Sequence, residues 1–146
     1  MSGPLSGSAS ANEPARGATP PKTILVVDDE PDTLQLLARR IEASGYAVVT
    51  ASDGMEALNK ARGLRPALMI LDLMLPKMDG YKVCSFLKFD ERYKRMPIVL
   101  LTARANADDH AKARDVKADH FLTKPCDLKE LMAVVERLVG AARESA

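Results

Sequence analysis

Five short apolar runs, each rich in β-branched residues, constrain the fold more than any other feature of this sequence. They cover residues 23–27, 46–51, 67–71, 97–101 and 120–123. Most are continuous rather than alternating between apolar and polar residues, as expected for strands that are covered on both faces. The segments between them carry apolar residues at helical spacing. This alternation predicts an α/β fold, in which five parallel strands form a sheet with five helices on its two faces.

The helical segments have recognisable starts and stops. Pro31 suits the first turn of a helix that Gly45 ends. Asp53 and Asp79 precede the second and third helices, the fourth is expected near residues 105–116, and the fifth follows Asp127. We expect the third helix to bury Val83, Phe86 and Leu87. Right-handed crossovers leave few possible strand orders, of which we favour 2-1-3-4-5.

The two ends of the chain differ from this pattern. Residues 1–22 are mostly Ser, Gly, Pro and Ala, and they hold too few apolar residues to offset the entropy of ordering. We therefore predict a disordered tail over 1–22, one domain over 23–142, and a short C-terminal tail over 143–146.

Composition limits the class of protein. The hydrophobic fraction of 47% and charged fraction of 28% are ordinary for a soluble domain. No apolar run approaches the roughly 20 residues of a membrane helix, and the N-terminus does not resemble a signal peptide, so we predict a cytoplasmic protein without membrane contact. The net charge of +1 disfavours direct nucleic-acid binding. Cys84 and Cys126 form no CxxC pair and are expected to be reduced.

The chemistry is expected where the strands end, because ligands of open parallel sheets bind beyond the carboxyl ends of the strands. Asp28 and Asp29 follow the first strand, Asp72 follows the third, Thr102 the fourth and Lys124 the fifth; these residues should meet in one pocket. Each alone has an ordinary structural explanation, such as a helix cap, a turn or a surface lysine. Their coincidence at consecutive strand ends favours a functional site.

These residue types suit phosphoryl transfer. Neighbouring carboxylates repel one another and call for a cation, and Mg²⁺ prefers carboxylate and phosphate oxygens. A lysine and a threonine hydroxyl can both bond a phosphoryl oxygen, and one carboxylate can act as the nucleophile.

The stretches ILVVDDE, LMILDLMLPKMDG, PIVLLTAR and ADHFLTKP resemble the response-regulator receiver family of two-component signalling over about 23–142. The resemblance implies the flavodoxin-like fold of the chemotaxis protein CheY. It implies that Asp72 is phosphorylated, that Thr102 and Lys124 contact the phosphoryl group, and that Phe121 is the switch aromatic. It also implies a cis Lys124–Pro125 peptide. The ligands implied for Mg²⁺ are Asp28, Asp29, Asp72 and the backbone carbonyl of Met74.

The resemblance also implies the partners. A sensor histidine kinase or phosphotransfer protein would supply the phosphoryl group, and a downstream protein would bind the face formed by the fourth helix, the fifth strand and the fifth helix. We expect a monomer or a weak phosphorylation-dependent dimer, and a phosphoacceptor rather than an enzyme. The sequence departs from the family at Lys77, Lys117 and Cys126, near faces that bind partners.

Several alternatives remain beside a stand-alone signalling domain. The sequence could be the receiver of a larger transcription factor or cyclase-type regulator, or a scaffold of the same fold that is never phosphorylated. A phosphatase of the haloacid-dehalogenase type is disfavoured because it needs an acidic group where Met74 stands. A flavodoxin is disfavoured because the acidic sequence DDEPD would repel phosphate.

Overall fold

The computed structural model describes residues 21–103 and 106–145, and side chains up to residue 140. Strands and helices alternate along the chain. They are β1 (Thr23–Val27), α2 (Pro31–Ala43), β2 (Ala47–Ala51), α3 (Gly54–Leu64), β3 (Leu68–Asp72), α4 (Gly80–Lys88), β4 (Ile98–Thr102), α5 (Ala107–Asp115), β5 (His120–Thr123) and α6 (Leu128–Ser145). All but the last two residues of the expected N-terminal tail lie outside the described residues.

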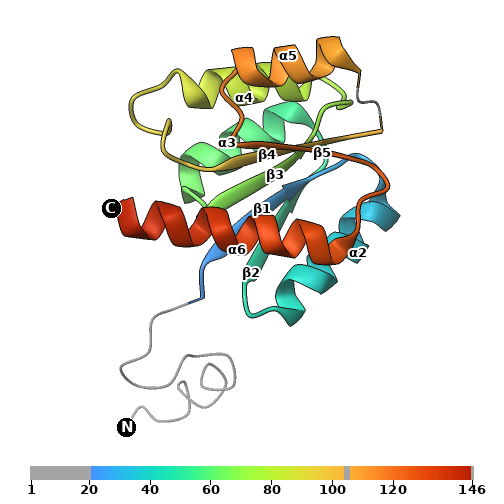
Figure 1. Cartoon of the computed structure of the whole chain (residues 1–146), viewed down its shortest axis with the longest axis vertical. Coiled ribbons are helices and arrows are strands. Elements are labelled where there is room, and N and C mark those ends of the chain that lie inside the picture. Colours follow the sequence, from blue (N-terminus) through green and yellow to red (C-terminus); the bar gives the residue numbers. More distant parts are fainter. Residues whose placement is uncertain (1–20, 104–105, 146) are drawn as a thin grey trace, which may run out of the picture.

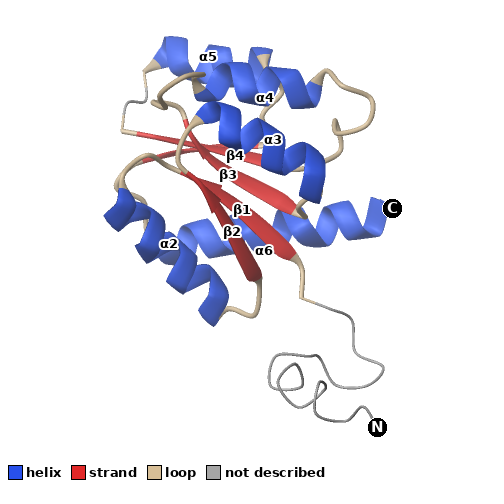
Figure 2. Ribbon diagram, turned by 180° about the vertical axis from the view of Figure 1, so that it is seen from behind, coloured by secondary structure: helices blue, strands red, loops and turns tan. Residues whose placement is uncertain are grey.

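The five strands form one sheet in the order β2-β1-β3-β4-β5, and every neighbouring pair is parallel. This confirms the predicted order and fold class. Figure 1 shows α6 crossing one face of the sheet, with α2 beside it, and Figure 2 shows α3 in front of the opposite face. The sheet is therefore the middle layer of three.

Each face of the sheet has its own hydrophobic core. Leu37 and Ile41 of α2 pack with Leu131 and Val135 of α6 against one face. On the other face, side chains from α3, α4 and α5 cover the strands, among them the fully buried Cys84. Burial raises the pKa of the Cys84 thiol to about 12, so this group stays protonated as part of the core.

The helix starts follow from local side-chain chemistry. Asp53 accepts a hydrogen bond from the backbone N–H of Glu56 at 2.8 Å, and Asp79 accepts one from Lys82 at 3.0 Å. Each aspartate thus satisfies an amide that the first helical turn leaves without a partner. Gly45 follows the end of α2 and has a φ of 100°, which agrees with the helix stop predicted at this glycine.

Two expectations need correction. Phe86 was expected in the core of the third helix, but its side chain is 49% exposed. Val83, Cys84 and Leu87 already fill the buried face of α4, which turns Phe86 toward solvent. The predicted C-terminal tail over 143–146 is helical as far as Ser145, because α6 continues through the good helix formers Ala, Arg and Glu.

The loop from α4 to β4 is fastened by one buried lysine. The ammonium of Lys88 donates to the carbonyls of Lys94 at 3.0 Å and Met96 at 2.9 Å. It also forms an ion pair of 2.7 Å with Asp119, whose carboxylate in turn accepts the backbone N–H of Ile98 at 2.8 Å. This network joins α4, the loop and the beginnings of β4 and β5.

No helix among the described residues combines the length and the apolar character needed to cross a membrane.

Candidate functional site

The parallel sheet brings four strand ends to one place. Asp28 directly follows β1, Asp72 and Thr102 are the last residues of β3 and β4, and Lys124 directly follows β5. The backbone N–H of Asp28 still bonds to the carbonyl of Ala51, at 3.1 Å, which fixes it at the end of the sheet. The strands thus position polar side chains that are far apart in the sequence.

Asp28 and Asp72 form an acidic cluster with the neighbouring Asp29. Carboxylate oxygens of Asp28, Asp29 and Asp72 all lie within 4.8 Å of one another. Asp28 is 1% exposed and Asp72 is 6% exposed, whereas Asp29 lies at the surface. The cluster therefore has a buried floor and one side open to solvent.

Lys124 bridges the two buried carboxylates. Its Nζ lies 2.7 Å from Oδ2 of Asp28 and 3.1 Å from Oδ2 of Asp72. Partial burial would lower the pKa of this lysine, but the hydrogen bonds and charges of the two carboxylates outweigh it and raise the pKa. Lys124 is therefore a fixed positive charge beside Asp72.

Asp72 is held from both sides. Its Oδ1 accepts the backbone N–H of Met74 at 3.1 Å, and its Oδ2 faces Lys124. Burial raises the pKa of this carboxyl group, and the bonds from Met74 and Lys124 only partly oppose the effect. A buried carboxylate with few hydrogen-bond partners is a better nucleophile than a well-hydrated one.

The two residues expected to act as a switch, Thr102 and Phe121, lie in the neighbouring strands β4 and β5. Thr102 is 1% exposed at the end of β4. Phe121 in β5 is partly buried and contacts His110 of α5, with the two ring centroids 4.6 Å apart and the ring planes inclined by 42°. The peptide between Lys124 and Pro125 is cis, as predicted.

Sequence reasoning missed the contacts that hold α5 to the domain. The ring of His110 lies on Phe121, and the hydroxyl of Tyr81 in α4 donates to the buried carboxylate of Asp109 at 3.1 Å. Asp109 also forms a capping box with Asn106 at the start of α5. The Asn-x-x-Asp spacing was the available signal, but it indicates a helix start and says nothing of Tyr81.

The residues present fit a magnesium ion. Mg²⁺ takes hard oxygen ligands and usually keeps several waters. The cluster supplies carboxylate oxygens on a buried floor, while exposed Asp29 leaves one side accessible to water. Cysteine and histidine ligands would favour softer metals, and neither residue type belongs to this cluster.

A family model described as "Response regulator receiver domain" matches residues 24–136. The chain is 44% identical over 118 residues to the alkaline phosphatase synthesis transcriptional regulatory protein PhoP of Bacillus subtilis, covering 81% of this chain and 48% of that protein. It is 42% identical over 116 residues to the DNA-binding dual master transcriptional regulator RpaA of Synechocystis sp., covering 80% and 48%. The chain thus spans about half the length of these curated relatives.

A solved structure gives the same result for the fold. The signal receiver domain of a signal transduction histidine kinase from Syntrophus aciditrophicus superposes with a TM-score of 0.78 at 34% identity, covering 82% of this chain and 91% of that one. This chain belongs to the response regulator receiver domain family of two-component systems. Members of this family typically bind Mg²⁺ in an acidic pocket, and they are generally not enzymes.

Proposed function

We propose that this domain is a phosphorylation switch that accepts a phosphoryl group on Asp72. The observation that carries the proposal is the position of Asp72: its carboxylate lies at the floor of the acidic cluster, within 3.1 Å of Lys124. A scaffold that is never phosphorylated would not need two buried carboxylates, Asp28 and Asp72, that share the charge of Lys124.

The expected reaction follows from these contacts. A carboxylate oxygen of Asp72 attacks phosphorus, and the donor leaves with the electron pair of its broken bond to phosphorus, which gives an acyl phosphate. Lys124 and the hydroxyl of Thr102 would bond to the phosphoryl oxygens. Asp28, Asp29, Asp72 and the carbonyl of Met74 would hold Mg²⁺, which supplies positive charge next to the phosphoryl group when bound.

Phosphorylation should be observable without a partner protein. Incubation with a small acyl phosphate and Mg²⁺ is expected to add one phosphoryl group per chain, and chelation of the metal is expected to stop the reaction. Intact-protein mass spectrometry measures both. Equal incorporation with and without a chelator would contradict the role given to the acidic cluster.

Mg²⁺ affinity is expected to depend most on Asp29. Replacing Asp29 by alanine should weaken Mg²⁺ binding about tenfold or more, since it removes one anionic oxygen ligand. The same change removes repulsion with Asp28 and Asp72, so the melting temperature without metal should rise. Titration of both proteins with Mg²⁺ measures the first effect. Asp32→Ala, an exposed aspartate in the first turn of α2, is the matched control and should bind Mg²⁺ like the wild type.

We expect the signal to leave the site through Thr102 and Phe121. When Thr102 moves toward the phosphoryl group, Phe121 can turn into the vacated space, and its contact with His110 would carry the change into α5. Among its described residues, α5 buries only Asp109 and Ala113, so little apolar area holds it in place. The surface that phosphorylation changes, and that a partner would bind, would consist of α5, β5 and α6.

Hydrogen exchange tests this route. Adding Mg²⁺ with beryllium fluoride, a stable mimic of the acyl phosphate, should change amide protection within residues 102–125. The strand β2, at the far edge of the sheet, serves as the internal control and should keep its exchange rates. A change confined to the surroundings of Asp72 would show that this route is wrong.

The donor would be a sensor histidine kinase or a phosphotransfer protein. A groove of about 400 Å³ beside Lys124 offers a docking place, because it is lined by Leu37, Leu101, Cys126 and the 57% exposed Leu36. A partner that covers this groove would bring its phosphoryl group next to Asp72.

A pull-down in which the beryllium fluoride complex is compared with the metal-free protein would identify the downstream partner.

The comparisons favour a second candidate for the output. The two relatives described above are named as transcriptional regulators, and they match over about half of their own length. In this candidate the sequence is the receiver part of a DNA-binding regulator, and the face of α5, β5 and α6 acts on an attached domain. In the first candidate, a stand-alone domain, the same face binds a separate protein. The sequence of the full-length transcript distinguishes them.

A further inference from the structure

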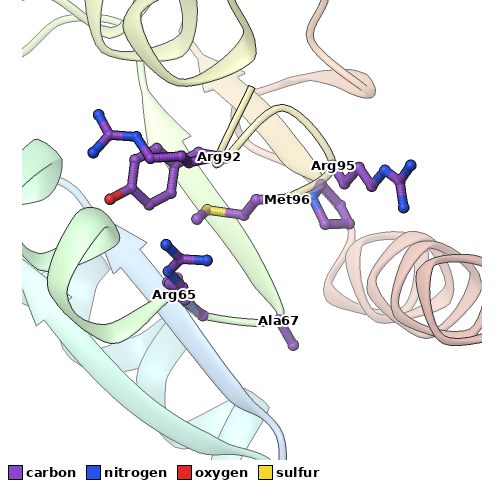
Figure 3. Close-up of a pocket in the computed structure, with 8 residues that line it drawn as sticks. Arg65, Ala67, Arg92, Arg95 and Met96 are labelled. Atoms are coloured by element: carbon purple, nitrogen blue, oxygen red, sulfur yellow. The ribbon is translucent and has the colours of Figure 1, made fainter. Parts of the chain in front are cut away.

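A cavity of about 240 Å³ lies at the opposite end of the sheet from the acidic cluster, where β3 and β4 begin. Its lining includes three arginines (Arg65, Arg92 and Arg95) and no acidic residue, while its apolar part includes Tyr93 and Met96. In Figure 3, Arg65 and Arg92 lie on two sides of the cavity and Arg95 points away from it. The phosphorylation reaction proposed above makes no use of these residues.

The ring of Tyr93 positions two of the guanidinium groups. The Cζ atoms of Arg65 and Arg92 are each 5.1 Å from the centre of this ring. The ring itself is fixed, because Tyr93 is only 7% exposed and its hydroxyl donates to the carbonyl of Arg62 at 3.5 Å. Stacking of this kind orients a guanidinium group and leaves the N–H groups at its edge able to bind an anion.

The charges of the cavity are only partly balanced. Arg92 is paired with Asp90 through two bonds, Nε to Oδ1 at 3.1 Å and an Nη atom to Oδ2 at 2.9 Å. Among the described residues, neither Arg65 nor Arg95 has an ion pair with a carboxylate. Since Arg95 points away, Arg65 is the arginine that faces the cavity without a carboxylate partner among the described residues.

The cavity is held in shape before any ligand arrives. Lys88 binds the carbonyls of Lys94 and Met96 and is anchored by Asp119, which fixes the loop that carries Arg92 and Tyr93. Met96, which forms part of the wall, is 8% exposed. A site that is already ordered loses little conformational entropy when a ligand binds.

We propose that this cavity binds a small organic phosphate monoester. A phosphate monoester carries close to two negative charges at neutral pH, which suits the guanidinium groups of Arg65 and Arg92 on two sides of the cavity. The guanidinium edge of Arg65 would bond the phosphate oxygens in a bidentate manner. The apolar side chains beside it would contact the organic part of the molecule, which the small volume limits to about one ring.

Phenyl phosphate is a suitable probe, used without metal and with a chelator so that Asp72 stays unmodified. Titration followed by amide chemical shifts should show changes at Arg65, Ala67 and residues 92–96. Arg65→Gly should weaken binding about tenfold or more, because a charge-assisted bidentate contact is lost. Glycine adopts the φ of 48° at this position without steric cost, so the variant is expected to fold. Arg39→Ala, which removes an exposed arginine of α2, should bind like the wild type.

Further arms of the experiment decide the class of ligand. Benzoate and inorganic phosphate should each bind at least about fivefold more weakly than phenyl phosphate, the first for its single charge and the second for its lack of an apolar group. Equal binding of benzoate would overturn the preference for phosphate, and equal binding of inorganic phosphate would overturn the role of the apolar wall. Shift changes outside the cavity, or wild-type affinity in Arg65→Gly, would overturn the site itself. None of these results depends on phosphorylation of Asp72.

Discussion

Asp72→Asn is expected to lower phosphoryl incorporation to background while the domain stays folded. An amide oxygen is a far weaker nucleophile than a carboxylate, and none of the other carboxylates in the cluster is placed next to both Met74 and Lys124 as Asp72 is. Intact-protein mass spectrometry after incubation with a small acyl phosphate and Mg²⁺ measures the effect. Full incorporation in the variant would assign the phosphoryl group to another residue.

Asp79→Asn is the matched control for this experiment. Asp79 lies in the loop after β3 and caps α4, and asparagine caps a helix about as well as aspartate. This variant should be phosphorylated like the wild type.

Asp72→Asn should also be more stable than the wild type near neutral pH. Burial raises the pKa of Asp72 above its ordinary value of 3.8, so the folded protein holds this proton more tightly than the unfolded chain does. Ionisation of Asp72 therefore costs stability as the pH rises above about 3.8, and below that value the cost is absent. Asparagine removes the cost. The gain in melting temperature should shrink as the pH is lowered through the acidic range.

Asp119→Ala is expected to cause the largest loss of stability, about 2–3 kcal/mol. The side chain of Lys88 is only 6% exposed, so its charge depends on Asp119, and the backbone N–H of Ile98 loses its acceptor in the same change. The estimate lies below the range for a fully buried pair because the side chain of Asp119 is 32% exposed. Urea denaturation at neutral pH measures it.

Asp115→Ala provides the comparison, since Asp115 is an exposed residue at the end of α5 and its loss should change stability by less than about 0.5 kcal/mol. If the two variants unfolded at the same urea concentration, the Lys88–Asp119 pair would have no special role in the fold.

The sheet could be predicted from the sequence because its strands are continuous apolar runs. Right-handed crossovers between them then leave few possible strand orders. Convergence of Asp28, Asp72 and Lys124 followed from that order, since parallel strands end at the same side of the sheet. The functional roles of these residues stay predictions, and the experiments above test them.

Contacts between distant segments could not be predicted in the same way. Lys88 has the appearance of an ordinary helix-end lysine, and only the fold shows that Asp119 and two loop carbonyls surround it. The apolar pattern of α4 includes Phe86 but does not show how wide the covered face is. The arginines around Tyr93 come from two loops that are about 30 residues apart in the sequence, and no local motif marks them.

The end of β3 is clamped by the start of α4. The backbone N–H of Gly80 bonds to the carbonyl of Leu73 at 3.0 Å, and a Cβ atom on Gly80 would lie 2.5 Å from the carbonyl oxygen of Asp72. The backbones of Gly80 and Asp72 therefore approach each other so closely that the start of α4 has no room to move toward β3. If Asp72 is phosphorylated as proposed, we therefore expect any displacement to pass through Thr102 to α5, which buries little apolar area. In the proposed switch, the fixed start of α4 would thus direct the movement toward α5.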